Sequence, residues 1–343
     1  MSVVGWAKLL AHSSPRGHGA PEILPTRMDR AARLCPPYEL VRSGTVAREF
    51  LRHATAAEVA AVFDRSLYLR SGEEFVCIGG PTIGNGPLTL IAARDLRPAL
   101  LGLRPGQPAV VSKTAITIAP VTFALKACEL WRPGAWPRAT SLAALKETQD
   151  LIARRAAIEA PEEGLGRAIS SKRETLIARA ARGRIAQFEA WLRDAIDADD
   201  ACPLPAPVQN LIGLGPGLTP SGDDFLIGAL ALLAAIGERK AHASLARALR
   251  EVPPGLTSPL SRAFLRAAAG GHVGEKLHQA VSSILRANAD AAIAAVRDVG
   301  HSSGWDMMAG STSALKVTLV PQTRSSHTPR GGHSCELRVQ KRH

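Results

Sequence analysis

The chain of 343 residues is poor in aromatic side chains and has no paired cysteine motif. Aromatic residues make up only 4%, which argues against the stacking surfaces that bind single-stranded nucleic acid. The five cysteines form no Cys-x-x-Cys pair, which excludes a zinc ribbon, and their odd number favours a reducing compartment. The longest apolar run, 225–236, is interrupted by Gly228 and is too short to span a bilayer, and no secretory signal pattern is found. We therefore expect a cytoplasmic protein with no membrane partner.

The folded part of the chain also lacks a strong excess of positive charge. The formal net charge is +12, but residues 1–34 carry +3 and residues 311–343 carry +5, which leaves +4 for the long middle segment. Basic ends of this kind are usually solvated and disordered. The basicity therefore does not predict a nucleic-acid interface, and we expect 1–34 to be irregular and 311–343 to be a disordered basic tail.

The pattern of the middle segment changes from strand-like to helical, which predicts an α+β fold. From about Val46, short β-prone runs are separated by turn residues, apart from a short helix expected over 56–62. The runs are 66–70, 75–78, 88–92, 109–112 and 115–118. We interpret 35–135 as a small antiparallel β region.

Apolar residues then recur every three or four positions, as on one face of a helix. The clearest series is Ile177, Ala181, Ile185, Phe188, Leu192 and Ile196, and further helices are expected at about 224–236, 259–269, 275–287 and 288–297. The region 136–310 is therefore predicted to be mainly helical.

The most informative segment is a glycine-rich turn, Leu211–Phe225, which leads into an apolar helix. Spaced glycines followed by a helix N-terminus present free N–H groups, which bind phosphate or carboxylate. A Walker A loop is disfavoured because Asp223 stands where its lysine is required, and a dinucleotide fingerprint is disfavoured because its third glycine is Leu218. The candidate anion-binding residues here are Gly215, Gly217, Thr219, Ser221 and Gly222.

Asp223 and Asp224 are candidate catalytic residues at the start of this helix. A purely structural interpretation is a capping box between Ser221 and Asp224. It does not require two adjacent acids, which can also hold Mg²⁺, orient an amide or act as a general base. The sequence leaves these three roles open: Mg²⁺ is the only cofactor it suggests, and no set of metal ligands is identified.

A second polar segment, 300–310, supplies His301 and Asp306 as candidate catalytic residues and Ser302 and Ser303 as candidate binding residues. His301 can act as an acid or base, and Asp306 can orient it or serve as a metal ligand. Alternatively, the segment can simply cap a helix that buries Trp305. The turn at 83–88 contains Asn-Gly, which favours a hairpin, although Asn85 is also a candidate for recognising a substrate. The segment Thr257–Ser261 is expected to be a capped helix start.

The segments GLGPGLTPSGDDFLIG and GHSSGWDMMAG resemble the family described as domain of unknown function 2877, as do the turn IGNGPL and the segment TSPLS. The resemblance covers roughly residues 40–310. That family includes the smallest subunit of the heteromeric oxamate carbamoyltransferase of allantoin catabolism, which interconverts oxalurate and phosphate with oxamate and carbamoyl phosphate. The resemblance implies a hetero-oligomer whose partners are an acyl-CoA-synthetase-like subunit and a second uncharacterised subunit. It also implies an apolar helix continuing beyond Gly310, where this chain becomes polar and basic.

Three functions follow from these observations. The first is a subunit of a carbamoyltransferase that acts on a small anionic amide. The second is a non-catalytic anion-binding or scaffold subunit of the same complex, and the third is a stand-alone Mg²⁺-dependent hydrolase or kinase-like enzyme. In the first, glycine-loop N–H groups hold phosphate or carboxylate, Asp223 or Asp224 accepts from the carbamoyl NH₂, and His301 moves a proton.

Overall fold

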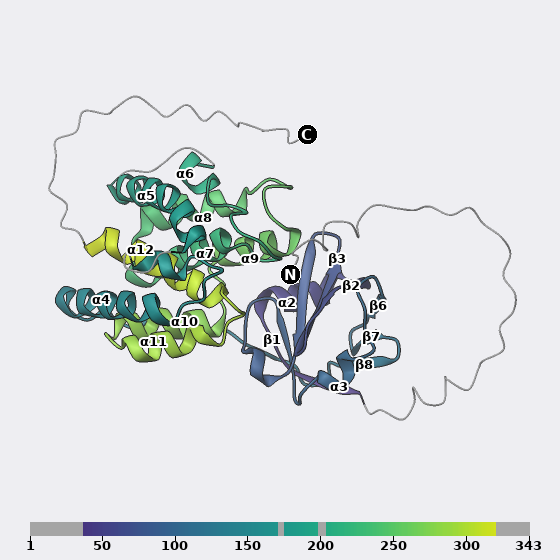
Figure 1. Cartoon of the computed structure of the whole chain (residues 1–343). Helices are drawn as coiled ribbons and strands as arrows, with labels where there is room; N and C mark the ends of the chain where they lie inside the picture. Colours follow the sequence, from purple (N-terminus) through teal and green to yellow (C-terminus); the bar gives the residue numbers. More distant parts are fainter. Residues whose placement is uncertain (1–36, 171–174, 198–203, 320–343) are drawn as a thin grey trace, which may run out of the picture. The chain divides into compact units, whose positions relative to one another are not determined.

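The computed structural model describes residues 37–170, 175–197 and 204–319 (Figure 1). The predicted N-terminal segment 1–34 and most of the predicted tail lie outside the described residues. The described chain contains both strands and helices in two successive regions, which confirms the α+β class.

The first region is a sheet that closes into an eight-stranded barrel, with a ninth strand paired to its edge. The strands are β1 (Tyr38–Ser43), β2 (Ala56–Val62), β3 (Ser66–Ser71), β4 (Glu74–Gly79), β5 (Thr89–Ala92), β6 (Pro108–Val111), β7 (Ala115–Ile118), β8 (Val121–Ala124) and β9 (Glu129–Leu130). The barrel closes because β1 pairs with β5 on one side and β8 on the other. The short helices α2 (Thr45–His53), η1 (Pro81–Ile83) and α3 (Arg97–Leu100) connect strands.

The expectation of a small antiparallel region is therefore wrong in two respects. The sheet is closed, and the pairs β4–β5, β1–β8 and β1–β9 are parallel. Both features depend on pairing between segments far apart in the chain, which local alternation cannot report. The helix expected over 56–62 is strand β2, because pairing with β3 and β6 outweighs the helix propensity of its alanines. The strand pattern expected from Val46 is instead helix α2, which buries Ala47 and Phe50.

The second region is helical. It contains α4 (Leu142–Glu159), η2 (Gly166–Ile169), α5 (Leu176–Asp197), α6 (Ala206–Gln209), α7 (Ser221–Ile236), α8 (Arg239–Arg250), α9 (Pro259–Ala269), α10 (Glu275–Leu285), α11 (Ala289–Arg297) and α12 (Ser303–Leu319). The helices expected from the apolar spacing are all present, with ends shifted by at most a few residues. None of these described helices is long and apolar enough to cross a membrane.

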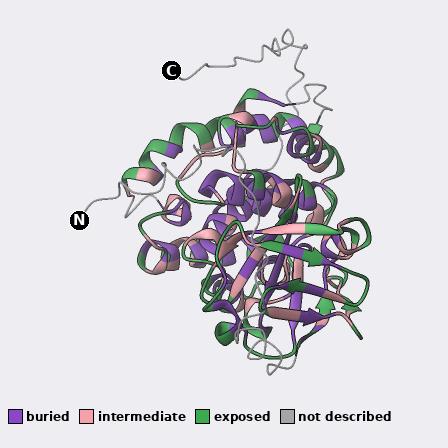
Figure 2. Ribbon diagram, turned by 90° about the vertical axis from the view of Figure 1, so that its right-hand side faces the viewer, coloured by how far each residue is buried: buried purple, intermediate pink, exposed green. Residues whose placement is uncertain are grey.

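Helix α7 is buried from Ser221 to Leu233 and belongs to the helical core. Figure 2 shows buried ribbons gathered in the interior of the molecule. Helix α7 packs most closely against α12. A β-carbon at Gly228 would overlap the backbone oxygen of Met307, and one at Gly310 would overlap that of Phe225. The two helices can therefore approach this closely only because each has a glycine at the crossing.

Helix α12 continues to Leu319, so the disordered tail does not begin at residue 311 as expected. The polar side chains after Gly310 are accommodated by hydrogen bonds inside the core. The Ser311 hydroxyl donates to the Gly228 carbonyl at 2.9 Å, and the Thr312 hydroxyl donates to the Met308 carbonyl at 2.9 Å. Because the buried Ser and Thr hydroxyls are hydrogen-bonded to backbone carbonyls, a helix of the core can have a sequence that looks polar.

Candidate functional site

The glycine-rich turn before α7 has the backbone geometry that its glycines predict. Gly213, Gly215 and Gly217 have φ angles of 71°, 110° and 100°, a region that L side chains rarely adopt. A β-carbon at Gly213 would also overlap the backbone oxygen of Leu256. We refer to residues 213–219 as the glycine loop. Pro216 and Gly217 in its middle are exposed, so the loop is open to solvent.

The glycine loop joins the N-termini of three helices. It leads directly into α7, and the Ser258 hydroxyl at the start of α9 donates to the Leu218 carbonyl. Thr219 Oγ1 lies 3.3 Å from the hydroxyl oxygen of Ser303, the first residue of α12. Helix N-termini carry the positive end of the helix dipole. Some of their N–H groups are used within the protein, since the Gly222 N–H donates to the Leu214 carbonyl at 2.8 Å and the Ser261 N–H donates to the Ser258 hydroxyl at 3.0 Å. The convergence of these N-termini on one exposed loop is suited to a small anion.

Asp223 is occupied by bonds within the protein. One carboxylate oxygen accepts from the Gly213 N–H at 2.8 Å, and the other accepts from the hydroxyls of Thr257 and of Ser261, the latter at 2.6 Å. Burial raises the pKa of Asp223, and the bonds from Ser261, Thr257 and Gly213 oppose that rise. Asp223 thus ties together the glycine loop, α7 and α9, and both of its oxygens have partners within the protein.

Asp224 differs sharply from its neighbour. It is only 2% exposed, and its Oδ2 accepts no hydrogen bond from any described residue. Burial raises the pKa of Asp224 well above its usual value; hydrogen bonding from Ser303 and Thr219 lowers it, whereas the charges of Asp306 and Asp223 raise it further. Asp224 therefore lies beneath the point where α7 meets α12, with one acceptor atom unused.

Asp306 lies on the first turn of α12 and has the same property. It is 1% exposed, its Oδ1 accepts from the Leu165 N–H, and its Oδ2 has no partner among the described residues. Burial raises its pKa to about 6, although the Leu165 amide and the Ser221 and Ser302 hydroxyls lower it. Two buried acids, each with one free oxygen, thus lie below the glycine loop.

Some predicted residues have other roles. Ser221 is the first residue of α7 and makes no capping bond, so the expected capping box is wrong. Gly222 is buried, and a β-carbon there would overlap the Leu211 carbonyl, so its small size serves packing. The Thr257–Ser261 segment is a capped helix start as predicted, since the Ser258 hydroxyl accepts from the Ser261 N–H at 3.0 Å.

His301 and Asn85 have their contacts elsewhere. His301 has a side chain that is 76% exposed, and its Nε2 lies 3.2 Å from the carboxylate of Glu163, so Glu163 takes the orienting position expected for Asp306. Asn85 donates through its N–H and its Nδ2 to Glu275 at 2.9 and 2.8 Å. The hairpin expected at Asn85 is absent, because the flanking strands β4 and β5 are parallel. Asn85 instead fixes a barrel loop to the start of α10.

Residues 163–166 also contribute to the site, although their sequence did not predict it. The Leu165 amide holds Asp306, and a β-carbon at Gly164 would overlap the carboxylate oxygen that it holds. A β-carbon at Gly166 would press on Trp305. The Gly-x-Gly spacing at 164–166 was a signal of close backbone approach, but nothing local indicated which residue approaches.

The barrel adds one side chain to the surroundings of the acids. Tyr68 of β3 packs edge-on against Phe264 of α9 with ring centroids 6.4 Å apart. Burial, then interactions with Cys77, and finally the charge of Asp224 raise the pKa of Tyr68 well above its usual value. The barrel therefore lies close enough to Asp224 for the charge of this carboxylate to raise the pKa of Tyr68.

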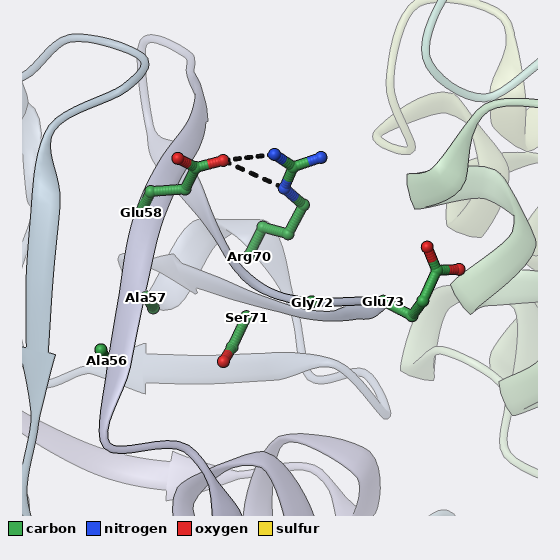
Figure 3. Close-up of a pocket in the computed structure, with 7 residues that line it drawn as sticks. All are labelled: Ala56, Ala57, Glu58, Arg70, Ser71, Gly72 and Glu73. Atoms are coloured by element: carbon green, nitrogen blue, oxygen red, sulfur yellow. Dashed lines mark hydrogen bonds and ion pairs between the residues drawn. The ribbon is translucent and has the colours of Figure 1, made fainter.

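The hollows on the barrel surface do not include the glycine loop. The one in Figure 3 is lined by Ala56, Ala57, Glu58, Arg70, Ser71, Gly72 and Glu73. Glu58 and Arg70 form an ion pair across it, and Glu73 pairs with Arg262 of α9, so its charges are already neutralised. In the described part of the chain, no three His, Cys, Asp or Glu side chains gather closely enough to hold a metal ion.

The raised pKa of Asp306 predicts a pH-dependent effect of replacing it. The pKa of Asp306 is about 6 in the folded protein, against an ordinary value of 3.8. The bound proton therefore makes its full contribution to the free energy of unfolding below pH 3.8, and this contribution is lost as the pH rises through 6. By this linkage, ionisation of the buried Asp306 carboxyl lowers the free energy of unfolding by about 3 kcal/mol at pH 8 and by about 1.5 kcal/mol at pH 5. Asp306→Asn keeps an acceptor for Leu165 without the charge. We expect urea unfolding to show the variant gaining stability over the parent between pH 5 and pH 8; a constant difference would contradict the assignment.

Residues 211–315 match the family model described as oxamate carbamoyltransferase subunit AllH. No solved structure matches the chain. The matched segment begins just before the glycine loop, contains Asp223, Asp224 and Asp306, and ends within α12. The segment that builds the site is therefore the part of this chain that is similar to a subunit of oxamate carbamoyltransferase.

Proposed function

We propose that the chain is a subunit of a carbamoyltransferase that binds a small anionic amide at the glycine loop. The observation that carries this proposal is the convergence of three helix N-termini on an exposed loop above two buried acids. The family match over the same residues supports a carbamoyltransferase subunit. It gives the anion a chemical identity, because the substrates of oxamate carbamoyltransferase are small carboxylates and phosphates.

The proposed reaction is the transfer of a carbamoyl group between oxalurate and phosphate. A phosphate oxygen forms a bond to the carbamoyl carbon, the bond from that carbon to the oxamate nitrogen breaks, and the nitrogen gains the proton that phosphate loses. The products are carbamoyl phosphate and oxamate. The protein's part is to hold the two anions together and to stabilise the negative charge that develops on the attacked carbonyl oxygen.

The residues of the site divide these tasks. The N–H groups of the glycine loop from Gly215 onward hold the anionic group together with the hydroxyls of Thr219 and Ser303, and Gly215 and Gly217 allow close backbone approach. The N–H groups of Gly213 and Leu214 are already used within the protein. His301 lies two residues before α12 and is oriented by Glu163, which suits it to carry the proton to the leaving nitrogen. An exposed position for His301 requires the substrate to extend outward from the loop.

The other subunits of the complex are the proposed partners, among them an acyl-CoA-synthetase-like protein and a second uncharacterised one. The test is to purify the full chain together with the products of its neighbouring genes and to measure carbamoyl phosphate formed from oxalurate and phosphate. We expect turnover that falls about 10²-fold in Asp224→Asn while the complex still assembles. Asp298→Asn, whose side chain is 70% exposed, is the matched control and should leave turnover unchanged.

A non-catalytic anion-binding subunit is the second candidate. It is favoured by the exposure of His301 and by the engagement of Asp223 in internal bonds, which leave few groups free for chemistry. Turnover that is unchanged in both Asp224→Asn and His301→Gln would select this function over the catalytic one. No turnover of oxalurate or related carbamoyl compounds by the complex would remove the carbamoyltransferase proposal altogether.

A further inference from the structure

Asp224 and Asp306, on the first turns of α7 and α12, each have one unsatisfied acceptor. The Oδ2 atoms of Asp224 and Asp306 are both buried and accept no hydrogen bond from the described residues. Buried polar atoms are nearly always hydrogen-bonded in native proteins, so two such atoms in one cluster need an explanation. Asp223, one residue away from Asp224, has both oxygens satisfied and shows that the fold can supply donors here.

We propose that the free oxygens of Asp224 and Asp306 accept the two N–H bonds of a ligand's terminal NH₂ group, and that they select amides and carbamoyl compounds over ligands of the same shape without that group. This inference rests on the proposed function and names the chemical class that its site recognises. It transfers the amide-binding role from the Asp223–Asp224 pair expected from the sequence to a pair on two different helices.

The number and type of atoms favour an NH₂ group over a metal ion. A primary amide offers two N–H donors, one for each free oxygen. It is also neutral, so no further acid is needed nearby to balance its charge. Mg²⁺ is also held by one or two carboxylates, but it keeps several water ligands in octahedral geometry, whereas both Oδ2 atoms are buried away from solvent. Among the described residues, the acids near Asp224 that affect its pKa are Asp306 and Asp223, and Asp223 is already fully bonded.

The charge state of the pair is compatible with a negatively charged ligand. The raised pKa values of Asp224 and Asp306, caused first by burial, keep the pair from carrying two negative charges near neutral pH. The protonated member of the pair can still accept one N–H bond through its carbonyl oxygen, while the ionised member accepts the other through its carboxylate. A carboxylate or phosphate at the glycine loop is then not repelled by two buried anions. Ser303 connects the two parts of the site, because its hydroxyl lowers the pKa of Asp224 and its oxygen lies 3.3 Å from Thr219 Oγ1 in the glycine loop.

The test compares pairs of molecules that differ only in this group. Oxamate and pyruvate have nearly the same shape, with NH₂ in one and CH₃ in the other, and carbamoyl phosphate and acetyl phosphate form a second pair. Binding of each to the full chain is measured by isothermal titration calorimetry. We expect the NH₂ member of each pair to bind at least about tenfold more tightly, as is typical of hydrogen bonds to charged acceptors.

Asp306→Asn is the decisive variant. The Leu165 N–H holds the oxygen of the new amide, so its NH₂ takes the place of the free oxygen and faces the NH₂ of the ligand. The preference for oxamate over pyruvate should fall to near unity or reverse. The variant loses a buried charge and is expected to fold at least as well as the parent. Asp298→Asn should keep the full preference.

Each outcome bears on the inference. Equal binding of oxamate and pyruvate by the parent chain, a preference that survives Asp306→Asn, or no binding of either probe would overturn it. Turnover of oxalurate by the complex without the NH₂ preference would remove this inference and leave the proposed function standing. A clear NH₂ preference without turnover would support this inference and remove the proposed function.

Discussion

Gly310→Ala is expected to destabilise the protein by about 3 kcal/mol or more and to abolish ligand binding at the glycine loop. The added β-carbon would overlap the backbone oxygen of Phe225, and a backbone atom cannot rotate away as a flexible side chain can. Helices α7 and α12 must therefore separate. Because Asp224 and Asp306 lie on the first turns of these helices, the separation also moves the two acids apart.

The matched control is Gly183→Ala on the exposed face of α5. Gly183 also lies inside a helix, but a β-carbon there would meet no atom within 4 Å. The higher helix propensity of alanine should then stabilise the fold by about 1 kcal/mol. Chemical unfolding of both variants measures the two effects. Equal effects of the two substitutions would show that the α7–α12 contact tolerates a side chain, contrary to the packing described above.

The local features of the site were predictable from the sequence, because they depend on neighbouring residues. The positive φ angles of the glycine loop follow from the spacing of Gly213, Gly215 and Gly217, and the apolar run after it predicts the buried helix α7. The capped start of α9 was likewise visible in its Ser-Pro pair. Each of these conclusions needed no more than about ten consecutive residues.

The closed barrel was not predictable in the same way. Its closure depends on β1, which pairs with β5 and β8, strands about 50 and 80 residues further along the chain. The alternation within each strand indicates only which residues face the same side. A prediction of short antiparallel strands is the natural result when long-range pairs cannot be seen.

The division of roles between Asp223 and Asp224 was also beyond the sequence. Adjacent residues on a helix point in directions about 100° apart, so one faces α9 and the glycine loop while the other faces α12. The partners of Asp223 come from positions 213, 257 and 261, and the neighbours of Asp224 come from positions 219, 303 and 306. Only the tertiary structure shows that the first acid is structural and the second has an acceptor to spare.

Asp223→Ala is expected to lower the free energy of unfolding by about 3 kcal/mol, because it leaves one buried and two part-buried donors without an acceptor. These donors are the Gly213 N–H and the hydroxyls of Thr257 and Ser261. Asp223→Asn should cost much less. Its oxygen can still accept from Gly213, and the two hydroxyls can rotate to accept from the new NH₂ group.

The two Asp223 variants also separate a structural from a direct role in ligand binding. If Asp223 acts by holding the glycine loop, Asp223→Asn keeps oxamate affinity within about threefold of the parent, because the loop stays tied to α7 and α9 by neutral hydrogen bonds. A direct contact with the ligand would instead make Asp223→Asn and Asp224→Asn equally harmful to binding, although only Asp223 is fully bonded within the protein. The two roles are distinguished by measuring stability by urea unfolding and affinity by calorimetry on the same preparations. Replacing a residue that holds the loop changes stability and affinity together, whereas replacing a residue that contacts the ligand changes affinity alone.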